Sequence, residues 1–120
     1  MTKILVTDDN SVYRQTVMEV LRMEGYEVIE AENGAVAVEQ IQQHQPDVVL
    51  CDLDMPVMNG LDVLVHLKAD ERTAHIPFVL VTGNTDETLM ERALSAGAAT
   101  FIRKPMNLSE LFRLLSQLTG

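Results

Sequence analysis

Side chains that can hold a metal ion or transfer a charged group follow four short apolar runs of the sequence. They are Asp8 and Asp9 after residues 4–6, Asp52 at the end of residues 47–52, Thr82 after residues 78–81, and Lys104 after residues 100–103. The carboxyl ends of parallel strands share one sheet edge, where ligands bind. If the runs are parallel strands, these groups lie together. Three close carboxylates repel one another and raise one another's pKa. A bound cation or a function is therefore the natural explanation for such a cluster.

Oxygen donors from a few carboxylates favour Mg²⁺ over zinc. Zinc is disfavoured because the chain has one cysteine, and His44, His66 and His75 lack the spacing of metal ligands. A divalent cation beside a carboxylate, a lysine and a hydroxyl is suited to phosphoryl transfer. The cation and the ammonium neutralise the phosphoryl oxygens, the hydroxyl donates a hydrogen bond, and a carboxylate is a possible nucleophile.

Each of these residues also has an ordinary structural explanation when it is taken alone. An acidic pair after a strand often caps a helix. Asp52 could be a solvated strand end, Thr82 could start a turn, and a lysine before a proline is usually a surface charge. These explanations do not account for the arrival of all of them at one edge of a sheet.

Short apolar runs alternate with amphipathic segments along the whole chain, which predicts an α/β fold. The predicted strands are residues 4–6, 26–29, 47–52, 78–81 and 100–103. The predicted helices are residues 11–24, a segment after Asn33 that ends before Pro46, a segment through Leu61 and Leu67, residues 85–96 with Leu94 inside, and a last helix through Leu108 and Leu118. Strand–helix alternation of this kind gives a doubly wound, five-stranded parallel sheet with helices on both faces.

The composition is that of one globular domain, residues 1–120, with 47% hydrophobic and 22% charged residues. A net charge of −9 and a pI near 4.6 argue against binding to nucleic acid or to anionic membranes. Cys51 lies in an apolar run and is expected to be a buried hydrophobic residue. No signal peptide or membrane span is evident, so a soluble, cytoplasmic protein without an output domain is expected, although a fragment of a larger regulator fits as well.

The motifs together resemble the receiver domain of two-component response regulators, of the chemotaxis-type single-domain kind. They are Asp8-Asp9, the segment from Asp47 to Gly60 with Asp52-Leu53-Asp54-Met55-Pro56, then Val81-Thr82-Gly83, and Lys104-Pro105. Any one match is modest, but all four in this order are specific, and they cover the whole chain. The resemblance implies a flavodoxin-like sheet of strand order 2-1-3-4-5. It also implies a cis peptide bond between Lys104 and Pro105.

The resemblance implies that Asp52 accepts a phosphoryl group from a phosphohistidine. The donor would be a sensor histidine kinase or a histidine phosphotransfer protein. By the same resemblance, Mg²⁺ would be held by Asp9, by Asp52 and by the backbone carbonyl of Asp54, with Asp8 acting through a water molecule. Asp54 and Asn84 would tune the lifetime of the phosphoryl group.

The resemblance also implies a switch. Thr82 would donate a hydrogen bond to the phosphoryl group and Lys104 would pair with it, while the ring of Phe101 turns inward. The output surface would then be residues 85–96, residues 100–103 and the last helix. Such a protein is not an enzyme beyond its own phosphorylation and dephosphorylation.

Three alternatives remain open at this stage. A receiver could dock to its partner without phosphorylation. Asp52-Leu53-Asp54 matches the DxD of haloacid-dehalogenase-type phosphatases, although those have it on the first strand. A flavin-binding module of the same topology is weakened by Asp8 and Asp9, which would repel a cofactor phosphate. The sequence does not identify the kinase, the output partner, the phosphoryl lifetime or the oligomeric state.

Overall fold

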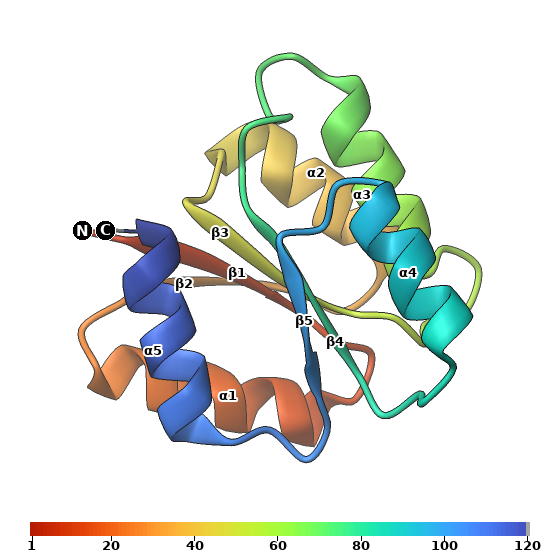
Figure 1. The fold of residues 1–120 in the computed structure, drawn as a ribbon. Helices are drawn as coiled ribbons and strands as arrows, with labels where there is room; N and C mark the ends of the chain where they lie inside the picture. Colours follow the sequence, from red (N-terminus) through yellow and green to blue (C-terminus); the bar gives the residue numbers. More distant parts are fainter. Residues whose placement is uncertain (120) are drawn as a thin grey trace.

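A computed structural model describes residues 1–119, which form five strands and five helices in strict alternation (Figure 1). The strands are β1 (Lys3–Thr7), β2 (Glu27–Ala31), β3 (Val48–Asp52), β4 (Phe78–Thr82) and β5 (Thr100–Arg103). The helices are α1 (Ser11–Met23), α2 (Gly34–His44), α3 (Gly60–Ala69), α4 (Glu87–Ser95) and α5 (Leu108–Thr119).

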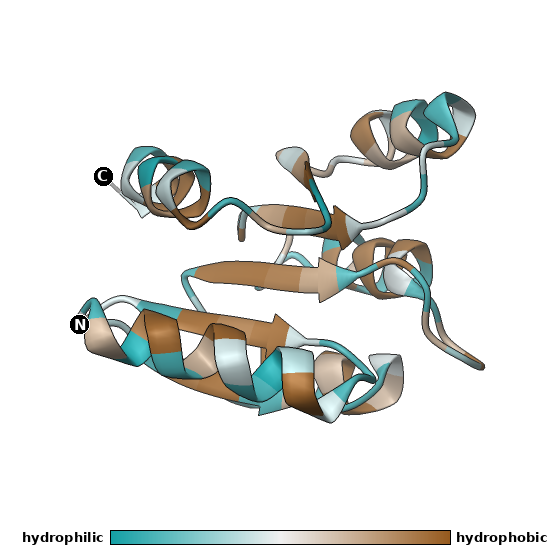
Figure 2. Cartoon of the chain, turned by 90° about the horizontal axis from the view of Figure 1, so that it is seen from below, coloured by the Kyte–Doolittle hydropathy of each residue, from teal (hydrophilic) through white to brown (hydrophobic). Residues whose placement is uncertain are grey.

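The sheet is parallel throughout and has the strand order β2-β1-β3-β4-β5, which confirms the expected topology. Helices α2, α3 and α4 cover one face, and α1 and α5 cover the other (Figure 1). All five residues of β3 and of β4 are buried, because central strands of such a sheet are covered on both faces. The apolar strands end at one common edge (Figure 2).

Some element boundaries differ from the sequence-based expectation. The second strand is Glu27–Ala31 rather than residues 26–29, because each of its residues pairs in register with β1, up to Thr7 opposite Ala31. Helix α4 begins at Glu87, since the Asp86 side chain accepts from the backbone N–H of Thr88 and caps the helix there. Leu94 was expected inside but is 45% exposed, while Met90 and Ala93 are the buried residues of that helix.

The start of α3 is fixed tightly against the end of β3. Asn59 and Asp62 form a capping box, in which each side chain accepts from the other residue's backbone N–H. A Cβ atom on Gly60 would lie 2.6 Å from the backbone oxygen of Asp52, so only glycine allows this approach. The loop after β3 therefore returns directly to Asp52.

Within residues 1–119, no helix is long and apolar enough to cross a membrane. Cys51 is fully buried in β3, as expected, and burial raises the pKa of its thiol.

Candidate acidic site at the carboxyl edge of the sheet

Three carboxylates from two neighbouring strand ends converge at the carboxyl edge of the sheet. Asp8 and Asp9 follow β1, and Asp52 is the last residue of β3. Carboxylate oxygens of these three residues lie within 4.8 Å of one another. Asp8 and Asp52 are buried, whereas Asp9 is exposed. The cluster predicted from the sequence is present, with one of its acids open to solvent.

Lys104, directly after β5, reaches across the edge to both buried carboxylates. Its Nζ atom lies 3.0 Å from Oδ2 of Asp8 and 3.6 Å from Oδ1 of Asp52. Burial alone would lower the pKa of this ammonium, but the hydrogen bond to Asp8 and the charges of both carboxylates raise it above its ordinary value. Lys104 is therefore a cation shared by the two acids. The Lys104–Pro105 peptide bond is cis, as the resemblance implied.

The ionised form of the Asp52 carboxyl group is destabilised by its surroundings in the fold. Burial raises its pKa to about 6; the Lys104 charge opposes this shift, and the Asp8 charge adds to it. The backbone N–H of Asp54 lies 3.4 Å from Oδ1 of Asp52, at the long end of hydrogen-bond range. The Asp54 side chain is exposed. A nearby cation would favour the ionised form of Asp52 and offset this cost.

Thr82 and Asn84 form one turn at the end of β4. The Thr82 side chain is fully buried, and its Oγ1 accepts from the backbone N–H of Asn84 at 2.9 Å. The backbone N–H of Lys104 donates to the Thr82 carbonyl at 2.8 Å, which ties this strand end to the lysine. Thr82 is therefore joined by hydrogen bonds to the backbone of Asn84 and to the backbone of Lys104.

Phe101 lies on β5, opposite Leu80 in the sheet register, and is only partly buried. It packs against the core cluster on the side of α2, α3 and α4. The Arg103 guanidinium lies 5.4 Å from the centre of its ring and donates to the backbone carbonyl of Asn84 at 3.0 Å. The ring is thus linked, through Arg103, to the loop that follows Thr82.

Two residues of the first turns of α1 support the site and were not predicted as site residues. Arg14 is buried, and it donates to the backbone oxygen of Asp8 at 2.7 Å while its Nε pairs with Glu30 at 3.1 Å. Tyr13 lies with its ring against the Lys104 ammonium. Apolar periodicity assigns Tyr13 to the core, and only its closeness in sequence to Asp8 could have indicated the site.

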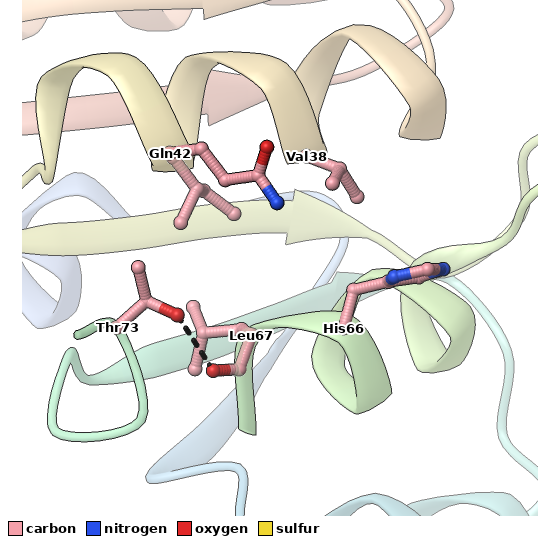
Figure 3. A pocket seen from close by; sticks show the side chains of 6 residues that line it. Val38, Gln42, His66, Leu67 and Thr73 are labelled. Carbon is pink, nitrogen blue, oxygen red and sulfur yellow. Dashed lines mark hydrogen bonds between the residues drawn. The ribbon is translucent and has the colours of Figure 1, made fainter. Parts of the chain in front are cut away.

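A small hollow between α2 and α3 is separate from this chemistry (Figure 3). Its volume of about 10 Å³ holds about one water molecule. His66 is the one titratable residue among those that line it, and the Thr73 hydroxyl donates to the Leu67 carbonyl there. None of the predicted site residues lines this hollow; those that do are Val38, Ile41, Gln42, His66, Leu67 and Thr73.

Comparisons with known proteins agree with the fold. A profile of the response regulator receiver domain matches residues 4–116. The chain belongs to the receiver domain family of response regulators. It is homologous both to response regulators and to the receiver domains of histidine kinases, a relationship consistent with phosphorelay signalling.

Two curated relatives and one solved structure illustrate the range of this receiver family. The transcriptional regulatory protein PdtaR of Mycobacterium tuberculosis is 38% identical over 91% of this chain, but the chain spans only 52% of PdtaR. The polar-differentiation response regulator DivK of Brucella ovis is 30% identical and is matched over 98% of its length, with all of this chain covered. The receiver domain of the sensor histidine kinase PA1611 of Pseudomonas aeruginosa, whose crystal structure has a magnesium ion coordinated in the active-site cleft, superposes with a TM-score of 0.91 at 29% identity, over 99% of this chain and 98% of that one.

Proposed function

We propose that this receiver domain, residues 1–120, accepts a phosphoryl group on Asp52 from a phosphohistidine, in a reaction that requires Mg²⁺. One observation supports this most. The Asp52 carboxylate is buried at the sheet edge, beside two further carboxylates and 3.6 Å from the Lys104 ammonium. The donor would be a sensor histidine kinase or a histidine phosphotransfer protein. The reaction would take place in the cytoplasm.

The transfer is a displacement at phosphorus. An oxygen of Asp52 forms the new P–O bond, the P–N bond of the phosphohistidine breaks, and the imidazole leaves and takes up a proton. The Lys104 ammonium lies beside the nucleophile and would pair with a phosphoryl oxygen. The Thr82 hydroxyl would turn from its contact with the Asn84 N–H to donate to another phosphoryl oxygen.

The donor set at this edge fits Mg²⁺, because it offers carboxylate oxygens and one of the three acids, Asp9, is exposed to water. The ion would be bound directly by Asp9, by Asp52 and by the backbone carbonyl of Asp54. Asp8 already accepts a hydrogen bond from Lys104 and would contact the ion through a water molecule. When bound, the ion supplies positive charge at the transferred phosphoryl group. Asp9 is exposed and can turn toward an ion without breaking a buried contact.

Mg²⁺ is expected to raise the melting temperature of the protein by several degrees at concentrations well above its dissociation constant. Binding to the folded state alone stabilises it by about 2.7 kcal/mol at a hundredfold excess over that constant. It also offsets the repulsion among the three carboxylates. Thermal unfolding monitored by circular dichroism in EDTA and in Mg²⁺ measures the shift. An unchanged melting temperature at saturating Mg²⁺ would contradict a metal site here.

Asp9→Asn is the matched variant for this measurement, because Asp9 is exposed whereas Asp8 has Lys104 as a partner. Removing its charge should slightly stabilise the metal-free protein and reduce the stabilisation by Mg²⁺. A clear loss of metal-free stability would show that Asp9 has a structural role instead.

Phosphorylation would be communicated through the turn after β4. Movement of Thr82 toward the phosphoryl group would break its contact with Asn84, whose carbonyl is also bound by Arg103 beside Phe101. The ring would then turn into the space left by Thr82. The surface that changes would be formed by α4, β5 and α5 and would bind an output protein. Asp54 and Asn84, near the phosphoryl group, would set its lifetime.

Incubation with acetyl phosphate tests the proposed reaction. We expect the intact mass to increase by one phosphoryl group in Mg²⁺ and to stay unchanged in EDTA. Rapid quenching ensures that a short-lived adduct is detected. If no adduct forms under these conditions, the protein is a receiver that docks without phosphorylation. Turnover of a generic phosphate ester would instead indicate the phosphatase alternative.

A further inference from the structure

The aromatic ring of Tyr13 faces the Lys104 ammonium, a contact between opposite ends of the chain. The Nζ atom lies 4.5 Å from the ring centroid, within the range of a cation–π interaction. The same Nζ atom contacts Asp8 and Asp52. The ammonium therefore has an aromatic face as a partner in addition to its two carboxylates.

We propose that Tyr13 is a positioning residue that holds the Lys104 ammonium for phosphoryl transfer to Asp52. The inference rests on the proposed function, because it assigns Tyr13 a part in that reaction. A lysine side chain has several rotatable bonds, and this one is 26% exposed, so it can swing toward solvent. Attraction to the ring opposes that motion.

An aromatic face suits this task better than a further acceptor group. The ring attracts the positive charge without accepting a hydrogen bond from a particular N–H group. The three N–H donors of Lys104 therefore remain available to oxygen atoms. The carboxylate partners change when a metal ion binds them or when Asp52 is phosphorylated. The ring does not change in either event, so it can hold the ammonium through the whole cycle.

The ring itself is well fixed. Tyr13 lies in the first turn of α1, and its backbone N–H donates to the capping side chain of Asn10 at 3.0 Å. The ring packs beside the core cluster under α1 and α5. Its hydroxyl is buried and forms no hydrogen bond of full geometry within residues 1–119. Burial raises the pKa of this phenol against the smaller opposing effects of Lys104 and of the Met106 backbone, so it stays neutral. The useful part of Tyr13 is therefore its ring face, and removal of the hydroxyl should cost little.

The test compares Tyr13→Phe, which keeps the ring, with Tyr13→Leu and Tyr13→Met, which remove it. The rate of phosphorylation by acetyl phosphate at saturating Mg²⁺ is the readout. The aliphatic variants should be roughly three- to tenfold slower than wild type, since this corresponds to the strength of a partly desolvated cation–π contact. Tyr13→Phe should stay within about twofold of wild type. Two aliphatic variants are used so that the test does not depend on the correct folding of a single one.

A double-mutant cycle with Lys104→Met separates positioning from a general structural effect. If Tyr13 acts through Lys104, then Tyr13→Leu should not slow the Lys104→Met protein further. An equal slowing in both backgrounds, or a wild-type rate in both aliphatic variants, would overturn the proposal.

Nuclear magnetic resonance gives a readout that needs no phosphorylation. The ε-methylene protons of Lys104 should be shifted upfield of those of Lys3 and Lys68 by the ring, in wild type and in Tyr13→Phe but not in Tyr13→Leu. If this shift is absent in wild type, the inference fails. If the shift is present but no phosphoryl group is accepted, the proposed function fails while the contact stands.

Discussion

Asp52→Asn is expected to abolish the phosphoryl adduct and, at the same time, to stabilise the metal-free protein. The nucleophilic oxygen is lost because an amide does not form an acyl phosphate under these conditions. The stability gain follows from the raised pKa of Asp52, about 6 in the folded protein against 3.8 in a model peptide. At pH 7.5 the folded state holds this carboxylate ionised at a cost, so its neutral replacement should add roughly 1–2 kcal/mol to the free energy of unfolding.

The raised pKa of Asp52 also predicts a pH dependence. Between about pH 4 and pH 6 the folded state binds more protons at Asp52 than the unfolded state does. The contribution of Asp52 to stability therefore falls as the pH rises through this range and is level above it. Urea unfolding of both proteins in EDTA tests this. The free energy of unfolding of wild type should fall relative to that of Asp52→Asn as the pH rises from about 4 to about 6. A constant difference between the two proteins would contradict the cost assigned to the carboxylate.

Asp54→Asn is the matched control, because it removes the same charge two residues later from an exposed side chain. This variant should still form the adduct, with a changed lifetime. An adduct that persists in Asp52→Asn and vanishes in Asp54→Asn would assign the nucleophile to Asp54.

Lys104→Met is expected to destabilise the metal-free protein by about 1–3 kcal/mol and to slow phosphorylation by roughly tenfold or more. The variant leaves two buried carboxylates without their shared cation. Methionine is similar in length to the apolar stem of lysine, so the loss is mainly one of charge. Mg²⁺ should restore much of the lost stability, because it also supplies positive charge to these acids. Urea unfolding with and without Mg²⁺ measures both effects.

Arg103→Met provides the comparison for this variant, since it removes the neighbouring cation from an exposed side chain. Exposed contacts of this kind contribute roughly 0–1 kcal/mol. Equal destabilisation by the two variants, or no recovery of Lys104→Met in Mg²⁺, would contradict the shared role of Lys104 with Asp8 and Asp52.

Sequence patterns were sufficient for the sheet and for the place of the site. Apolar strands such as Val48–Asp52 are buried on both faces, and a strand end fixes where its next polar residue lies. The sequence alone therefore places Asp8, Asp52 and Lys104 at one edge of the sheet. Their roles in phosphoryl transfer remain predictions, because position alone does not show reactivity.

The features that the sequence did not reveal depend on particular side-chain contacts. Tyr13 follows the apolar period of its helix, so nothing local distinguishes a core ring from one that faces an ammonium at the other end of the chain. Arg14 is buried only because the Asp8 carbonyl and Glu30 approach it in the fold. Helix α4 starts later than expected because a side-chain cap at Asp86 overrides helix propensity.

Locating the phosphoryl group on the chain tests the central claim most directly. The protein is phosphorylated with acetyl phosphate in Mg²⁺, quenched, and reduced with borohydride, which converts an aspartyl phosphate to homoserine. The digested protein is then sequenced by mass spectrometry. We predict a single homoserine at position 52, dependent on Mg²⁺. Modification at Asp8, Asp9 or Asp54 instead, or none in a fully quenched sample, would contradict the assignment of Asp52 as the phosphoryl acceptor.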